Sequence, residues 1–123
     1  MSTLELVIDG YKEAVYFTED KIELEEGEFL SLADGEFSSI TDANIHNDCT
    51  QAVIYANQEF PGILNDSNAE RFGHDLWLTR NHHGAGFWDG DWPEDFGKIM
   101  TAFSSGMGEK HAYSNVDGDI DLE

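Results

Sequence analysis

Positively charged residues are scarce in this chain of 123 residues, and so are cysteine and proline. Lys and Arg total 6 against 26 Asp and Glu, so the formal net charge is -20. So few cations argue against direct binding to DNA or RNA, because such binding replaces counterions with positive side chains. An anionic membrane surface is disfavoured for the same reason. Solubility alone explains this charge poorly, since self-repulsion costs stability. The charge therefore favours basic partner surfaces or divalent cations.

Cys49 is the single cysteine, so an internal disulfide is excluded and nothing indicates an oxidising compartment. The first residues lack a basic region followed by a long apolar run, so no signal peptide is predicted. No stretch approaches the roughly 20 apolar residues of a membrane span. With 40% hydrophobic residues, the sequence predicts a soluble cytoplasmic protein with one compact domain over residues 1–123.

Apolar spacing predicts three helices, over residues 4–18, 40–60 and 92–106. In the first, Gly10 carries the usual helix cost of about 1 kcal/mol. Between the first two lies an acidic segment, 19–36. The predicted buried stripe of the first helix is Leu4, Val7, Ile8, Tyr11, Ala14 and Val15, and that of the second is Ile45, Cys49, Ala52, Val53, Ala56 and Phe60. Asp91 is the expected N-cap of the third helix, whose apolar face is Phe96, Ile99, Met100, Phe103 and Met107.

Two β-hairpins are predicted, over residues 74–89 and 110–122. In the first, Leu76 and Leu78 would face one side of a strand and Trp77 the other, with a polar turn beginning near Asn81. In the second, the dipeptide Asp117-Gly118 is a good turn signal. The predicted fold class is α+β, with an antiparallel sheet built from the two hairpins and about three helices packed on one face.

Residues 73–89 read Gly-His-Asp-Leu-Trp-Leu-Thr-Arg-Asn-His-His-Gly-Ala-Gly-Phe-Trp-Asp. This run resembles the core motif of a family of small uncharacterised proteins of tailed bacteriophages and prophages. The helix around Tyr11 and the Asp117-Gly118 turn also resemble that family. The sequence departs from the family at His82, where glycine is usual, so His82 would have to tolerate a positive φ. The resemblance implies a phage origin and a shared fold, but no activity.

The polar residues of residues 74–89 support two interpretations. As an enzyme site, His82 or His83 would act as general base, with Asp89 orienting it and Arg80 holding an anion. As a structural motif, the aromatic residues fill the core, Arg80 pairs with Asp75 or Asp89, and Asn81 supports the turn. The structural interpretation is favoured, because no nucleophile motif is present. Its residues are Asp75, Trp77, Arg80, Asn81, His83, Gly84, Gly86, Phe87 and Trp88.

A specific metal site is not predicted. No helical pair of histidines and no cysteine pair fixes a coordination geometry for the available side chains. Asp117, Asp119 and Asp121 echo the spacing of a calcium loop, but the distal glutamate of such a loop is missing. In and beside the motif, the residues whose side chains could bind a metal are His74, His82, His83, Asp89 and Asp91.

Two regularly spaced rows of acids suggest a different function. Glu5, Asp9 and Glu13 follow each other at about 6 Å along the first helix. A second row repeats at about 6 to 7 Å along the last strand. Both steps approach the spacing of phosphates along a nucleic-acid strand. The alternative is an ordinary solvated surface, since any chain so rich in acids produces some regular spacings. The second row is Asp117, Asp119, Asp121 and Glu123.

These observations together favour a small acidic phage protein that binds and inhibits a host or defence protein by mimicking DNA. The expected partner is a basic, nucleic-acid-binding host or phage protein, in the cytoplasm of the infected bacterium. No cofactor, no direct nucleic-acid binding and no membrane contact are expected, and the protein would be a monomer or homodimer. The alternatives are a metal-dependent or histidine-based enzyme centred on residues 80–89, and a structural or dimerising phage protein.

Overall fold

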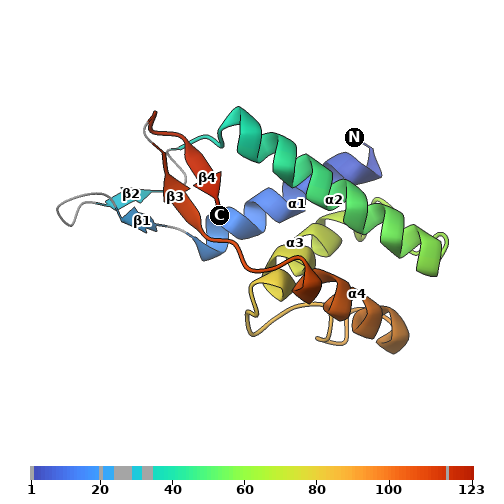
Figure 1. The fold of residues 1–123 in the computed structure, drawn as a ribbon. Coiled ribbons are helices and arrows are strands. Elements are labelled where there is room, and N and C mark those ends of the chain that lie inside the picture. The colour runs from blue at the N-terminus through green and yellow to red at the C-terminus, as the bar shows by residue number, and fades with distance from the viewer. Residues whose placement is uncertain (1, 20, 24–28, 32–34, 116) are drawn as a thin grey trace.

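The computed structural model describes residues 2–19, 21–23, 29–31, 35–115 and 117–123. Within these ranges the chain forms four helices and two antiparallel pairs of short strands, in agreement with the predicted α+β class (Figure 1). The acidic segment 19–36 is described only in part, because residues 20, 24–28 and 32–34 lie outside these ranges. In chain order the elements are α1 (Thr3–Thr18), β1 (Lys21–Glu23), β2 (Phe29–Ser31), α2 (Ser39–Glu59), α3 (Ala69–Arg80), α4 (Glu94–Gly106), β3 (Ala112–Ser114) and β4 (Ile120–Leu122).

Helix α1 confirms the first predicted helix and its buried stripe. Ser2 begins it by accepting a hydrogen bond from the backbone N–H of Glu5, which satisfies one of the free donors of the first turn. The stripe has a buried centre and partly buried flanks, since Leu4 and Ile8 are only partly covered. The fully covered members are Val7, Tyr11, Ala14 and Val15.

Two glycines explain how α1 and α3 pack so closely. A Cβ atom on Gly10 would lie 2.1 Å from the carbonyl oxygen of Glu70, and one on Gly73 would lie 2.0 Å from that of Val7. The two backbones therefore touch where the helices cross, and only glycine fits there. The glycine in α1 costs helix propensity, but it permits the main helix-helix contact of the core.

Helix α2 confirms the second predicted helix. Its N-cap is Ser38, whose hydroxyl accepts from the backbone N–H of Thr41. The predicted stripe faces the core, although Val53 and Phe60 are only partly covered. Its fully covered members are Ile45, Cys49, Ala52 and Ala56.

The hairpin predicted over residues 74–89 is wrong, because its first half is the end of helix α3. The pattern misleads because α3 is covered on most of its circumference. Leu76 and Trp77, neighbours in sequence, are both fully buried, and so are Phe72 and Arg80. A helix covered on most sides lacks the polar stripe by which amphipathic helices are recognised.

The predicted turn at residues 81–83 is the C-terminal cap of α3. The backbone N–H of His82 bonds to the carbonyl of Thr79, and that of His83 bonds to the carbonyl of Leu78. These two bonds form a Schellman motif, which satisfies the last helix carbonyls. Its left-handed position is His82, with a φ of 56°. The expectation that His82 tolerates a positive φ is therefore confirmed.

Residues 84–93 return over α3 and α4 without helix or strand, although the second strand of the hairpin was predicted to end at residue 89. The backbone N–H of Phe87 bonds to the Thr79 hydroxyl of α3. The Phe87 ring packs on Phe72 and Phe96, with ring centroids 5.3 and 6.2 Å apart respectively. A Cβ atom on Gly97 would lie 2.6 Å from the Phe87 carbonyl oxygen, so glycine lets α4 meet this segment closely. The segment joins α3 to α4 through aromatic packing.

Helix α4 confirms the third predicted helix, but its N-cap is Pro93 where Asp91 was expected. Phe96 and Met100 are fully buried, as predicted. The remaining predicted face residues, Ile99, Phe103 and Met107, are partly buried. The helix therefore presents the predicted apolar face to the core.

The hairpin predicted over residues 110–122 is confirmed as β3 paired with β4, with Ala112 opposite Leu122. The prediction that two hairpins form one sheet is not confirmed. The second hairpin is β1 with β2, from the acidic segment, and the two pairs are separate sheets. Both lie at one end of the helical body, near the C-terminal end of α1, and not beneath a layer of helices (Figure 1). A parallel bridge between Phe37 and Ile120 places β4 beside the beginning of α2.

Candidate functional site

Arg80 is the residue of the motif best suited to hold an anion, and the structure uses it differently. Its side chain is 2% exposed. Its guanidinium donates to the Tyr11 hydroxyl at 3.0 Å, the Asp48 carboxylate at 2.9 Å and the carbonyls of Met107 and Gly108. The predicted pairing with Asp75 or Asp89 is therefore wrong. Arg80 joins α1, α2 and α3 to the end of α4, and it is not available to a ligand.

The proposed catalytic histidines, His82 and His83, are exposed. His82 faces Glu109 at 3.6 Å, a weak surface pair. Asp89, expected to orient a histidine, instead accepts a hydrogen bond from the backbone N–H of Gly86 at 3.0 Å. His83 is exposed at the end of α3. The four residues of the enzyme interpretation are close in sequence, but their contacts do not make a catalytic group.

The possible metal ligands are also separated. His74 lies 3.7 Å from Glu13, on the side of α3 that meets α1, while His82 faces Glu109. Over the described ranges, no three His, Cys, Asp or Glu side chains are arranged to hold a metal ion. Burial raises the pKa of the Cys49 thiol, so this cysteine is a core residue and not a reactive one.

Asp75 has a structural role on the other side of α3. Its side chain is buried and accepts a hydrogen bond from the Trp92 indole N–H at 2.7 Å. Burial raises the pKa of Asp75 above 3.8, while the Trp92 bond opposes this rise and the nearby Asp89 and Asp91 add to it. This contact fixes Trp92 against α3.

The raised pKa of Asp75 predicts a dependence of stability on pH. The folded protein binds the proton of the Asp75 carboxyl more tightly than the unfolded chain does. Protonation of Asp75 therefore adds to the free energy of unfolding. This contribution is complete below about pH 4 and is lost as the pH rises through the raised pKa. Asp75→Asn keeps the acceptor without the charge. Urea unfolding should show this variant more stable than the wild type at pH 7, with the two converging near pH 4.

Asp75→Ala is the control for this experiment. It removes the acceptor and leaves the Trp92 indole N–H buried without a partner, which costs about 1 to 3 kcal/mol. If Asp75→Asn destabilises the protein as much as Asp75→Ala does at pH 7, the raised pKa assigned to Asp75 is contradicted.

The acid row of α1 is exposed to solvent. Glu5, Asp9 and Glu13 are all exposed, and Glu13 also lies 3.7 Å from His74 of α3. Phe17 continues the row by another four residues, and it is 85% exposed. The row of three acids and one aromatic therefore spans about 18 Å of helix. Phe17 was missed in the sequence, although it falls outside the apolar stripe of α1 and its position on the polar face was a readable signal.

The acid row near the C-terminus is only partly available. Asp121 is engaged, because hydrogen bonds from Ser38, Thr41 and Asn115 hold its carboxylate and lower its pKa. It ties the β3–β4 hairpin to the first turn of α2. Asp121 is thus a structural acceptor and not a free phosphate substitute.

The other acids of that row surround a shallow hollow. Asp117 and Asp119 belong to the turn between β3 and β4, and Glu123 follows β4. The hollow measures about 550 Å³ and includes two exposed apolar side chains, Ile40 and Tyr113. Asp119, Asp121 and Glu123 alternate with the buried Ile120 and Leu122 as the prediction assumed, whereas Asp117 lies in the turn.

Much of the positive charge in the chain is neutralised within it. Arg80 is buried against Asp48, Lys12 pairs with Asp42, and Lys98 pairs with Glu94. These contacts use three of the six Lys and Arg residues. Each pair also engages one acid, so the net charge of -20 is carried by the acids that have no cation beside them.

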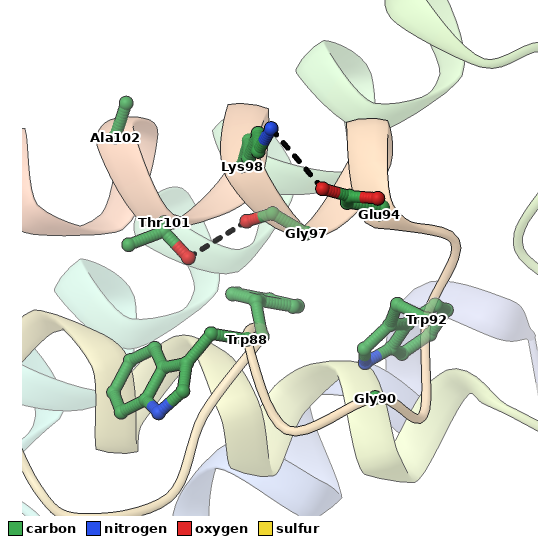
Figure 2. A pocket seen from close by; sticks show the side chains of 9 residues that line it. Trp88, Gly90, Trp92, Glu94, Gly97, Lys98, Thr101 and Ala102 are labelled. Atoms are coloured by element: carbon green, nitrogen blue, oxygen red, sulfur yellow. Dashed lines mark hydrogen bonds and ion pairs between the residues drawn. The ribbon is translucent and has the colours of Figure 1, made fainter.

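A groove of about 560 Å³ lies between α4 and residues 87–92 (Figure 2). Trp88 and Trp92 are on the loop side, and Lys98 and Thr101 are on the helix side. Trp92 is almost covered, whereas Trp88 is 48% exposed. The Trp88 ring lies over Gly86, where a Cβ atom would come within 2.5 Å of it. Glycine at position 86 therefore makes room for the Trp88 ring, about half of which stays exposed.

The remaining residues of the motif serve the fold. Trp77 is buried, donates to Thr18 and packs edge-on against Tyr11. Asn81 donates to the Trp77 carbonyl and accepts from the backbone N–H of Lys110. Gly84 is exposed.

Over the described part of the chain, no helix is long and apolar enough to cross a membrane.

Comparisons with protein-family models, with curated proteins and with solved structures returned no match to this chain. The resemblance to phage proteins therefore stays a hypothesis that rests on residues 73–89 and the segments around them.

Proposed function

We propose that this chain is a small acidic binding protein that occupies the basic surface of a partner, with α1 as the main contact. The observation that carries the proposal is the exposed row of Glu5, Asp9, Glu13 and Phe17 on one face of α1. Like charges four residues apart slightly destabilise a helix. The row therefore slightly lowers the stability of α1, and contact with a partner explains it better than a contribution to the fold does.

The partner that suits this row best carries Lys and Arg along a groove. Carboxylates about 6 Å apart meet such a groove as the phosphates of a nucleic-acid strand would. Phe17 adds an aromatic anchor, the side-chain type enriched at energetic centres of interfaces. We therefore propose that the protein blocks the nucleic-acid site of its partner.

The source and setting of the protein belong to the same proposal. The motif in residues 73–89 resembles phage proteins, and a phage protein of this charge would inhibit a host or defence protein in the cytoplasm of an infected bacterium. Electrostatic attraction would speed association and weaken as salt rises. The sharpest form of the proposal is inhibition by DNA mimicry.

Pull-down from bacterial lysate tests the proposal. At low salt the protein should capture nucleic-acid-binding proteins. Added duplex DNA or single-stranded RNA should release them, because the nucleic acid and this protein would compete for one site on the partner. Captured proteins that stay bound in the presence of nucleic acid would contradict mimicry, as would the absence of nucleic-acid-binding proteins from the captured set.

The triple substitution Glu5→Gln, Asp9→Asn, Glu13→Gln tests the row itself. It should weaken partner binding by about tenfold or more and flatten its salt dependence. Removing like charges four residues apart stabilises α1 slightly, and losing the exposed Glu13 contact with His74 costs little, so the fold should be kept. Titration of the captured partner at several salt concentrations measures both effects.

The matched control removes the same number of charges elsewhere. Glu36, Glu59 and Glu109 are exposed and lie outside α1, so their change to Gln should leave affinity within about twofold. Phe17→Ser should weaken binding without changing its salt dependence. Equal loss in both triple variants would show that only the net charge matters and would overturn the assignment to α1.

A further inference from the structure

The exposed face of α1 ends in an aromatic side chain. Phe17 follows Glu13 by four residues, as Glu13 follows Asp9, so its ring continues the line of the acids. Of the large hydrophobic side chains in the described part of the chain, Phe17 is the most exposed. It lies outside the core, although burial of a phenyl ring is among the larger apolar contributions available to a fold. A partner that covers this ring would gain the apolar contact that the fold leaves unused.

The acids of this face advance along α1 in steps that suit an extended single strand of nucleic acid. Each step of four residues moves about 6 Å along the helix axis. In a duplex, each strand advances only about 3.4 Å along the axis per phosphate, because it winds around that axis. The three carboxylates of α1 therefore fit a groove that holds one extended strand better than a groove that follows a duplex.

A duplex would in addition require a second row of acids beside the first. Its two backbones lie on either side of grooves that are about 6 Å and about 12 Å wide. The second row predicted from the sequence does not provide this, because Asp121 is held by the hydroxyls of Ser38 and Thr41 and Asp117 lies in the turn. Of the two predicted rows, the α1 row alone is exposed along its whole length.

An exposed ring beside the acids is also what a single strand presents to a protein. Unpaired bases are open to stack on aromatic side chains, and proteins that bind single strands combine a positive groove with such aromatic platforms. In a duplex the bases stack on one another, and a protein reads only their edges in the grooves. In this comparison Phe17 corresponds to a base, and Glu5, Asp9 and Glu13 correspond to phosphates.

We propose that the outer face of α1 docks into the groove of a protein that binds single-stranded nucleic acid. The carboxylates of Glu5, Asp9 and Glu13 would pair with Lys and Arg side chains of that groove, and Phe17 would stack on an aromatic residue where a base normally lies. The inference rests on the proposed function and narrows its partner to one class. Charge complementarity directs α1 to a basic groove, and the ring adds a preference for grooves that hold unpaired bases.

Elution from two DNA resins tests this preference. Proteins of a bacterial lysate are bound at low salt to one resin that carries single-stranded DNA and to another that carries the same sequence as a duplex. The purified protein is then added as the eluant, and the released proteins are quantified. Release from the single-strand resin should begin at a concentration about tenfold or more below that needed on the duplex resin, because only the first set of proteins offers a stacking platform.

Variants of α1 separate the row and the ring from the net charge. The triple substitution in the row should lose the elution, whereas the control triple outside α1 has the same net charge and should elute as the wild type does. Phe17→Leu keeps an apolar side chain without the ring, so about tenfold more of it should be needed. Phe17→Tyr keeps the ring and should stay within about twofold. Phe17 is exposed, so neither substitution disturbs the core.

The outcomes distinguish this inference from the proposed function. Equal release from both resins, or greater release from the duplex resin, would overturn the preference for single strands and leave the proposed function standing. Elution by Phe17→Leu at the concentration of the wild type would overturn the stacking role of Phe17. Release from neither resin would contradict the proposed function itself, and this inference with it.

Discussion

Gly73→Ala is expected to cost about 3 kcal/mol or more in the free energy of unfolding, a large share of the roughly 5 to 15 kcal/mol available to a domain. The added Cβ atom would lie 2.0 Å from the Val7 carbonyl oxygen and 2.6 Å from the Tyr11 backbone nitrogen. Neither atom can rotate away, so α1 and α3 must separate. Urea unfolding followed by circular dichroism measures the loss.

Gly106→Ala is the matched control for that substitution. Gly106 is the last residue of α4, no other group lies within 4 Å of an added Cβ, and its φ is not positive. Alanine there should leave stability unchanged or raise it by up to about 1 kcal/mol through helix propensity. Equal effects at Gly73 and Gly106 would contradict the close helix crossing.

Arg80→Met is expected to destabilise the protein by about 3 to 5 kcal/mol, although methionine fills a similar volume. The substitution leaves the Tyr11 hydroxyl, the Asp48 carboxylate and two carbonyls at the end of α4 without their donor. Arg80→Lys keeps the charge but lacks the planar fork, so it should recover only a minor part of this loss. Denaturant unfolding of both variants gives the comparison.

Arg71→Met separates burial from charge in this experiment. Arg71 is exposed on the same helix, and its substitution should change stability by less than about 0.5 kcal/mol. A double-mutant cycle of Arg80→Met with Asp48→Asn should show coupling, because the two side chains share one contact. A small effect of Arg80→Met, close to that of Arg71→Met, would return Arg80 to the candidates for anion binding.

Helices α1, α2 and α4 were predictable because each buries one side and exposes the other. A single buried face leaves an apolar repeat of helical period in the sequence. Helix α3 leaves no such repeat, because Leu76, Trp77, Thr79 and Arg80 are buried on several sides by α1, α4 and residues 84–93. Its contiguous apolar residues resemble a strand, and only packing distinguishes the two.

The candidate site was predictable to a similar degree. The row Glu5, Asp9 and Glu13 depends only on the period of α1, and the structure places all three in solvent. The same reasoning, applied to a strand, predicted that Asp121 is free. In the structure its carboxylate accepts hydrogen bonds from the hydroxyls of Ser38 and Thr41, some 80 residues away in sequence. Spacing along an element says which face a side chain takes, but not what meets it there.

By itself, the sequence determined the strong negative charge, the three amphipathic helices, the C-terminal hairpin and the exposure of the acid row. These follow from composition and from local periodicity, which do not depend on the rest of the fold. Tertiary structure alone decided that α3 is a helix, that Arg80 is a buried clamp and that Trp88 borders a groove. Each of these depends on contacts between segments distant in sequence, and such contacts leave no local period to read.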